Sequence, residues 1–142
     1  LVYFLSSGYS DSEYYHHLTK EYEGNKIVMA PEFTMNTGIS YTQAIKSSLF
    51  KSFTATTSVT GFGTQYFDEA NTMKQDPYFL WNMDLGISGK HIDFHVWGKN
   101  ILDKNFFCYM FNSPVGNNLP EYMKSGQSGA PSRFGASITI KL

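Results

Sequence analysis

The fold of this chain is decided by one stretch, PYFLWNMDLGISGKHIDFHVWGKNILDKNFF, which runs from Pro77 to Phe107. Its first half alternates between apolar and mostly polar residues, and successive side chains of a strand point to opposite faces of a sheet. Gly89 and Lys90 interrupt this alternation, which resumes at Ile92. Glycine accepts the positive φ of a tight turn at little steric cost. The stretch therefore predicts a β-hairpin with one apolar face and one mostly polar face.

The same alternation recurs on both sides of the hairpin, and polar connections separate the runs. The segment from Asn112 to Pro131 contains three prolines and three glycines, which predicts a long loop. No stretch has the periodicity of a helix. We therefore expect an all-β fold, an antiparallel meander of about six strands. Besides the hairpin, its strands are predicted within residues 1–15, 32–42, 52–66 and 132–142.

The predicted connections alternate in length along the chain. Those at residues 44–48 and 89–90 are short, whereas those at 16–31 and 112–131 are long. In a meander, every second connection lies at the same end of the sheet, so short turns gather at one end and long loops at the other. This arrangement, with strands of about ten residues, matches the wall of a transmembrane β-barrel. A soluble sandwich also alternates, but its loops need not sort by length.

Composition narrows the classes of protein that are possible. Of the 142 residues, 42% are hydrophobic, 17% are aromatic and only 16% are charged, against a usual charged share of roughly 25%. The net charge of −1 gives no reason to expect nucleic acid as a partner. Cys108 is the single cysteine, so an intrachain disulfide and an all-cysteine metal site are both excluded. Because Leu1 opens directly onto a strand pattern, we expect the chain to be part of a longer protein.

Four patches of the sequence carry a family resemblance. Trp97–Lys104 is similar to an Asn-Leu-(Phe/Leu)-Asp-Lys penultimate strand, and Gly129–Gly135 to a Gly-x-Pro-Arg-x-aromatic-Gly start of a last strand. Ala30–Gly38 resembles an Ala-Pro-x-aromatic-Thr-x-Asn strand start, and Tyr66–Asn71 precedes a further strand. In their order and spacing, the patches resemble the C-terminal end of TonB-dependent outer-membrane receptors.

This resemblance implies a 22-stranded barrel with an N-terminal plug domain, located in the outer membrane of a Gram-negative bacterium and powered through TonB. Residues 1–142 would form a single segment, the C-terminal portion of the barrel, without the plug and the earlier strands. The implied partners are outer-membrane lipid, the rest of the barrel and the plug, and the TonB complex through the missing N-terminal part. The implied substrate is a bulky nutrient such as an iron–siderophore complex, haem, cobalamin or a glycan. No cofactor is expected.

In a barrel, the two faces of the sheet meet different surroundings, with the apolar face toward lipid and the polar face toward the lumen. We expect the lumen-facing wall to contain Asn82, Asp84, Arg133, Ser137, Thr139 and Lys141. We expect the lipid-facing side to contain Trp81, Met83, Leu85, Phe134, Ile138, Ile140 and Leu142.

Candidate ligand-contact residues lie in two connections. His16 and His17 would point to opposite faces on a strand but could share a metal on a loop, and an ordinary polar rim is the favoured interpretation. Phe107, Tyr109 and Phe111 follow the penultimate strand, where an aromatic girdle at the membrane interface is favoured over a stacking surface for a ligand. No nucleophile motif, catalytic carboxylate pair or phosphate-binding glycine loop is present, so we do not expect an enzyme. The alternative function is a soluble antiparallel β-sandwich that binds a ligand through its loops.

Overall fold

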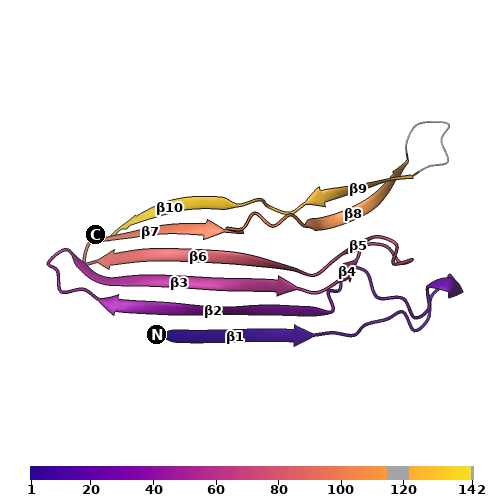
Figure 1. Ribbon diagram of the computed structural model, residues 1–142, viewed down its shortest axis with the longest axis horizontal. Helices are drawn as coiled ribbons and strands as arrows, with labels where there is room; N and C mark the ends of the chain where they lie inside the picture. The colour runs from indigo at the N-terminus through magenta and orange to yellow at the C-terminus, as the bar shows by residue number, and fades with distance from the viewer. Residues whose placement is uncertain (115–121, 142) are drawn as a thin grey trace.

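The computed structural model describes residues 1–114 and 122–141. Its main feature is one six-stranded antiparallel sheet (Figure 1). The strands follow one another in space in the order of the sequence, with two small hairpins inserted, so the predicted meander is confirmed. In sheet order they are β1 (Val2–Tyr9), β2 (Phe33–Ala44), β3 (Phe50–Phe62), β6 (Tyr78–Gly89), β7 (Ile92–Lys99) and β10 (Arg133–Ile140).

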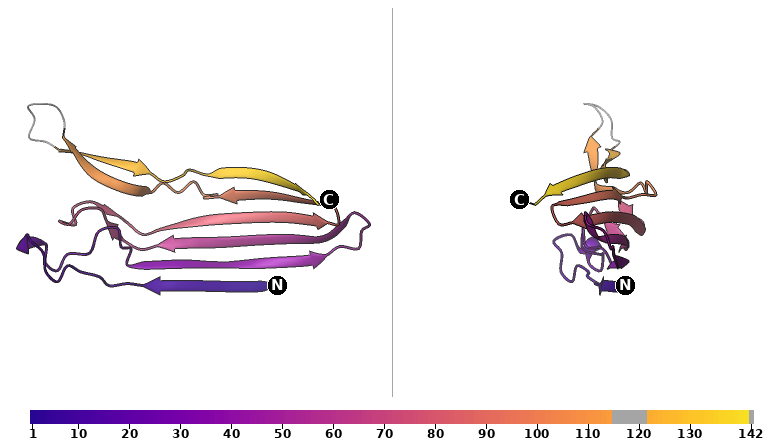
Figure 2. Two further views of the ribbon diagram at one scale, coloured as in Figure 1. Left: turned by 180° about the vertical axis from the view of Figure 1, so that it is seen from behind. Right: turned by 90° about the vertical axis from the view of Figure 1, so that its left-hand side faces the viewer.

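The connections sort by length as predicted. The short β2–β3 and β6–β7 turns lie at one end of the sheet together with both chain termini, and the long connections lie at the other (Figure 1). Seen from behind and end-on, the six strands form a single layer (Figure 2). The long connections contain a 3-10 turn, η1 (Lys20–Tyr22), and a two-residue hairpin of β4 (Gln65–Tyr66) and β5 (Lys74–Gln75).

The expectation of a long loop from Asn112 to Pro131 is wrong for the part that the structure describes. β8 (Phe107–Pro114) and β9 (Tyr122–Ser128) pair as an antiparallel hairpin that projects beyond the sheet (Figure 1). Two of the prolines do not prevent this pairing, because Pro114 ends β8 and Pro131 follows β9. Gly126 is accommodated inside β9 beside the ring of Phe107. Residues 115–121 lie outside the described part.

The register confirms the alternation of the two faces, because residues directly opposite each other in neighbouring strands share a face. Leu85, Val96 and Ala136 are directly opposite one another on the apolar face. Asp84 and Trp97 are directly opposite on the polar face. In β1, Tyr3 pairs with Ile39 and Leu5 with Thr37, which places both on the apolar face, whereas Phe4 pairs with Gly38 on the polar face.

Few side chains in the described part of the chain are buried. The buried apolar residues there are Phe67, Met73 and Tyr78, all close to the end with the long connections. The apolar face itself is open to its surroundings, and Phe134, for example, is 69% exposed. Other large exposed side chains on this face are Leu5, Phe79, Phe94, Val96, Ile138 and Ile140. The ladder of backbone hydrogen bonds and the cross-strand pairs therefore stabilise the sheet more than an internal core does.

Aromatic rings cover several strand glycines from the neighbouring strand. Phe134 is directly opposite Gly98, and a Cβ at Gly98 would lie 2.9 Å from its Cε1 atom. Trp97 is directly opposite Gly135, and a Cβ there would lie 2.6 Å from its Cε2 atom. Each ring thus fills the space that a side chain would take and compensates for the loss of packing at a glycine within a strand.

Replacing Gly38 by alanine should lower the free energy of unfolding by about 1–3 kcal/mol, the usual cost of overpacking. A Cβ at Gly38 would lie 2.5 Å from Cζ of Phe4 and would also press against the backbone oxygen of Thr57, which cannot rotate away. Denaturant unfolding in detergent micelles would measure the change. Gly8→Ala is the matched control in the same strand pair, since its nearest neighbour is Thr34 Oγ1 at 3.3 Å. Equal destabilisation by both variants would contradict this account.

Candidate functional site

The predicted wall residues fall on two faces as expected. By register or by contact, Asn82, Asp84, Arg133, Ser137, Thr139 and Lys141 share the polar face. The predicted lipid-facing residues Trp81, Met83, Leu85, Phe134, Ile138 and Ile140 share the other face, and Leu142 lies outside the described residues. That one face meets a lumen and the other meets lipid stays a prediction.

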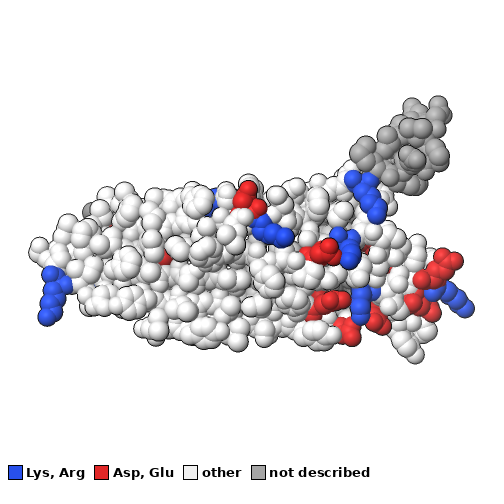
Figure 3. All heavy atoms as spheres, in the orientation of Figure 1, with Lys and Arg blue, Asp and Glu red and all other residues white. Residues whose placement is uncertain are grey.

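Two contacts between an acidic and a basic side chain cross strands on the polar face. Asp84 Oδ1 lies 3.2 Å from His95 Nδ1, which joins β6 to β7. Lys141 donates a hydrogen bond to Asp93 Oδ1 at 2.8 Å, near the end with the short turns. Figure 3 shows few charged side chains over the strands on the visible face of the molecule. It shows acidic and basic groups together at the end with the long connections.

Two of these long connections are tied to each other. Asn71, in the connection between β3 and β6, accepts a hydrogen bond from the backbone N–H of Lys26 at 2.7 Å. Its side-chain amide donates one back to the Lys26 carbonyl at 3.0 Å. Lys26 in turn donates to Asp11 and Glu13, and these hydrogen bonds hold the pKa of its ammonium group well above the usual range. The connection between β1 and β2 is therefore fixed against its neighbour.

His16 and His17 have separate polar partners in the structure. His17 Nδ1 accepts a hydrogen bond from the Thr19 N–H at 3.0 Å, and its Nε2 lies 3.4 Å from Glu69 Oε2. His16 Nδ1 lies 3.6 Å from Glu23 Oε1, and its side chain is 82% exposed. Across residues 1–114 and 122–141, no three His, Cys, Asp or Glu side chains are grouped closely enough to hold a metal ion. All three contacts are polar, as a polar rim would require, and the rim itself stays a prediction.

The aromatic row Phe107, Tyr109 and Phe111 lies on β8, on the projecting hairpin, rather than at the end of a wall strand. Each of the three side chains is about 40% exposed. The rings of Tyr109 and Phe111 stack with centroids 5.9 Å apart. Flat apolar rings with open faces offer stacking surface to a planar or apolar ligand.

A second set of stacked rings contains Phe62, Tyr78 and Phe106. Tyr78 stacks on Phe106 at 4.5 Å between centroids, and Phe62 stacks on Tyr78 at 5.2 Å. Phe62 and Tyr78 are directly opposite residues of β3 and β6, so only the strand register brings them together. The hairpin is anchored by the backbone N–H of Phe107, which donates to Gln75 Oε1 at 2.8 Å.

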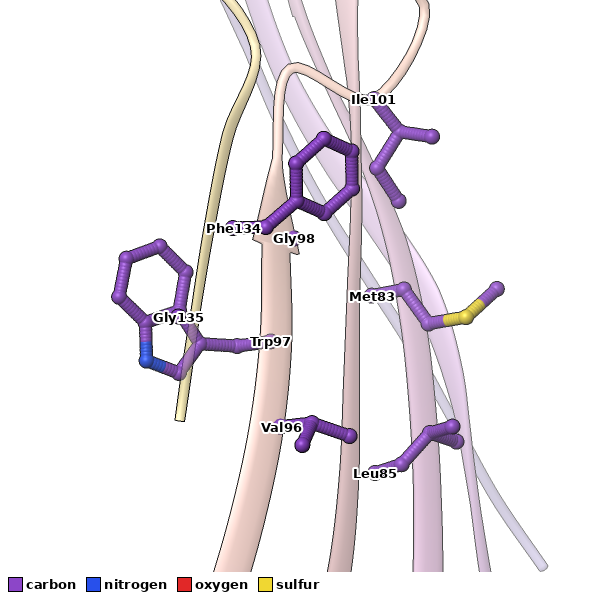
Figure 4. Close-up of a pocket in the computed structure, with 8 residues that line it drawn as sticks. All are labelled: Met83, Leu85, Val96, Trp97, Gly98, Ile101, Phe134 and Gly135. Atoms are coloured by element: carbon purple, nitrogen blue, oxygen red, sulfur yellow. The ribbon is translucent and has the colours of Figure 1, made fainter. Parts of the chain in front are cut away.

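Two hollows accompany these features. The first, of about 440 Å³, lies where the β4–β5 and β8–β9 hairpins meet. In it, Lys74 donates to Asp76, and this hydrogen bond raises the pKa of Lys74. The second, of about 450 Å³, is an apolar groove beside Gly98 on the apolar face, between Met83 and Phe134 (Figure 4). Because its lining is almost entirely hydrocarbon, the second hollow offers no group for proton transfer or metal binding.

Comparison with known proteins defines the fold. A search against models of protein families matches none of them. The structure is similar to the crystal structure of the ferric yersiniabactin uptake receptor FyuA from Yersinia pestis, with a TM-score of 0.72 and 18% sequence identity. The match covers 84% of this chain and 17% of the receptor chain. At this identity the likeness shows the fold, and it confirms the predicted class: an all-β antiparallel sheet of six strands that matches a segment of a receptor barrel.

The matched protein is an uptake receptor and not an enzyme. Among the residues that the structure describes, no helix is long and apolar enough to cross a membrane.

Proposed function

We propose that this chain is the C-terminal part of the barrel of a TonB-dependent receptor in the outer membrane of a Gram-negative bacterium. The observation that carries the proposal is the single-layer sheet with one exposed apolar face and one polar face. Burying apolar surface contributes about 25 cal/mol per Å², so an apolar face of this extent requires a cover. Lipid supplies such a cover for a barrel strand.

A soluble β-sandwich would cover the same face with a second sheet about 10 Å away. In the described part of the chain, the other hairpins lie at the end of the six-stranded sheet and not across it (Figures 1 and 2). The sandwich therefore lacks its second layer within these residues, and the barrel segment is the better supported function.

In this proposal the polar face lines the lumen around a plug domain, and the long connections face the outside of the cell. The receptor takes up a bulky nutrient such as an iron–siderophore complex, haem, cobalamin or a glycan, with energy delivered through TonB. The exposed aromatic row on β8, Phe107, Tyr109 and Phe111, would contact the ligand by stacking. His16 and His17 would belong to the polar rim of the same outer surface.

Spin labels at two neighbouring positions test the membrane placement. Ile138 lies on the apolar face and is 63% exposed, whereas Ser137 lies on the polar face. In the receptor reconstituted in vesicles, a label at Ile138 should be accessible to oxygen, which concentrates in lipid. A label at Ser137 should be accessible to a water-soluble nickel chelate or be shielded from both. An Ile138 label that collides mainly with the nickel chelate would contradict the proposal.

Uptake is tested in cells. The intact mass of the outer-membrane polypeptide that carries this sequence should be several times 16.1 kDa. Accumulation of one radiolabelled nutrient of the classes named above should fall when its gene is deleted and when TonB is removed. Uptake that persists without TonB, or a polypeptide of about 16 kDa outside the membrane fraction, would contradict the proposal.

A further inference from the structure

Two cationic side chains are directly opposite each other on the polar face. Arg133, the first residue of β10, pairs with Lys99, the last residue of β7. Directly opposite residues on one face have Cβ atoms about 5 Å apart, and like charges in such a pair repel each other. Both residues are exposed. An anion bound between them would relieve this repulsion.

The acidic groups near this pair are engaged elsewhere. Asp84 contacts His95 at 3.2 Å, and Asp103 accepts a hydrogen bond from the Ser132 N–H at 2.8 Å. Within the described part of the chain, the side chains of Lys99 and Arg133 have neither an ion pair nor a hydrogen bond.

Lys141 provides the contrast on the same face. It lies just beyond the other end of β10 and has its own carboxylate, that of Asp93 at 2.8 Å. At the opposite end of β10, Lys99 and Arg133 have no carboxylate at ion-pair distance among the described residues, and Asp84, which lines the same hollow, contacts His95 instead.

A hollow of about 390 Å³ opens beside the two cations and is lined by Asp84, Trp97, Lys99 and Arg133. The Trp97 ring lies over Gly135, the residue directly opposite it in β10. Figure 4 shows this ring extending toward β10 and away from Val96 and Leu85 of the apolar face. The hollow thus combines two cations, one flat aromatic wall and the Asp84 carboxylate, which contacts His95, and its volume suits a small molecule.

We propose that Lys99 and Arg133 bind the carboxylate of a small organic acid whose aromatic or apolar body packs on Trp97. A guanidinium fork matches the two oxygens of a carboxylate, and an ammonium group adds a second positive charge. A bound carboxylate also removes the repulsion between the two cations. The inference deepens the proposed function by naming a ligand class for the polar face, and it rests on that function only in requiring solvent access to this face.

Fluorine NMR on the full-length receptor in detergent micelles tests the site with two probes of the same shape. 4-Fluorobenzoate carries the carboxylate, and 4-fluorobenzamide replaces it with a neutral amide. At constant ionic strength, 4-fluorobenzoate should bind and 4-fluorobenzamide should bind at least tenfold more weakly. Lys99→Gln and Arg133→Gln should each raise the Kd of 4-fluorobenzoate about tenfold, the low end for a charge-assisted hydrogen bond at an exposed site. Lys141→Gln, which removes the same charge from the same face, should leave this Kd within about twofold.

Three results would overturn the inference: no binding of 4-fluorobenzoate to the folded protein, equal binding of the two probes, or an equal loss of affinity in Lys141→Gln. Circular dichroism of each variant checks that the strands remain intact. The spin labels at Ile138 and Ser137 separate this inference from the proposed function. If the labels report the expected surroundings and the probe does not bind, the carboxylate-site inference is wrong and the membrane placement stands. If the probe binds in a charge-dependent way and the Ile138 label is exposed to water, the proposed membrane placement is wrong and the carboxylate-site inference stands.

Discussion

Replacing Asn100 by alanine is expected to lower the free energy of unfolding by about 3 kcal/mol. Asn100 is only 4% exposed and has a positive φ of 50°, a conformation that asparagine accepts more readily than alanine. Its side chain accepts from the Lys104 N–H at 2.9 Å and donates to the carbonyls of Lys104 and Ala130 at 3.0 and 3.1 Å. Each partner left without a hydrogen bond costs about 1 kcal/mol or more. Denaturant unfolding of the protein in micelles measures the loss.

Asn105→Ala serves as the control for this prediction. Asn105 belongs to the same connection, but it is exposed and its side chain forms none of these hydrogen bonds. Its replacement should change the free energy of unfolding by less than about 0.5 kcal/mol, as surface substitutions usually do. If the two variants are equally stable, the turn after β7 does not depend on Asn100.

Replacing Ala136 by arginine is expected to destabilise the protein by about 2–4 kcal/mol in a bilayer, the cost of a cation on the lipid face near the midplane. Ala136 lies in the middle of β10 on the apolar face, directly opposite Val96. If the apolar face meets lipid, as proposed, the side chain of an arginine there would enter hydrocarbon. Urea titration of the protein folded into phosphatidylcholine vesicles, followed by tryptophan fluorescence, gives the difference in stability.

Ser137→Arg is the matched control, because Ser137 is the next residue and faces the other side of the sheet, opposite His95. Both residues are small and exposed, so volume and strand position are nearly equal. Ser137→Arg should cost less than about 1 kcal/mol if the polar face meets water. Equal costs at the two positions would show that the sheet does not separate lipid from water.

Much of the fold follows from the alternation of residues alone. The hairpin after β6, the two faces of β6 and the sorting of connections by length all depend on local patterns, and all are present in the structure. The turn lies one residue later than predicted, at Lys90 and His91, and Gly89 ends β6 without a positive φ. The ends of the strands were harder to predict. β7 stops at Lys99, although the apolar residues Ile101 and Leu102 follow, because Asn100 and Asp103 both adopt a positive φ. That turn is set by hydrogen bonds to residues far along the chain, such as Ala130, which no local pattern encodes.

The candidate site was predictable to a similar extent. Alternation separated Asp84 and Arg133 from Leu85 and Phe134 correctly. It could not bring Arg133 opposite Lys99, because that pairing needs the register of two strands more than 30 residues apart. The sequence predicted Asn82 only as a residue of the lumen-facing wall. In the structure its Oδ1 atom also accepts a hydrogen bond from the Asn100 N–H at 3.1 Å.

The two hydrogen bonds between the Asn71 side chain and the Lys26 backbone limit where insertions can occur in this protein during evolution. Because both backbone groups of Lys26 are held by one side chain, a residue inserted next to either partner would dislodge both connections at once. Insertions at the exposed tip around η1 would leave these hydrogen bonds intact. Among natural relatives, the segment around η1 should therefore vary in length, whereas the segments around Lys26 and Asn71 should keep theirs. This end of the sheet can then change in sequence and size while the hydrogen bonds between the two connections are kept.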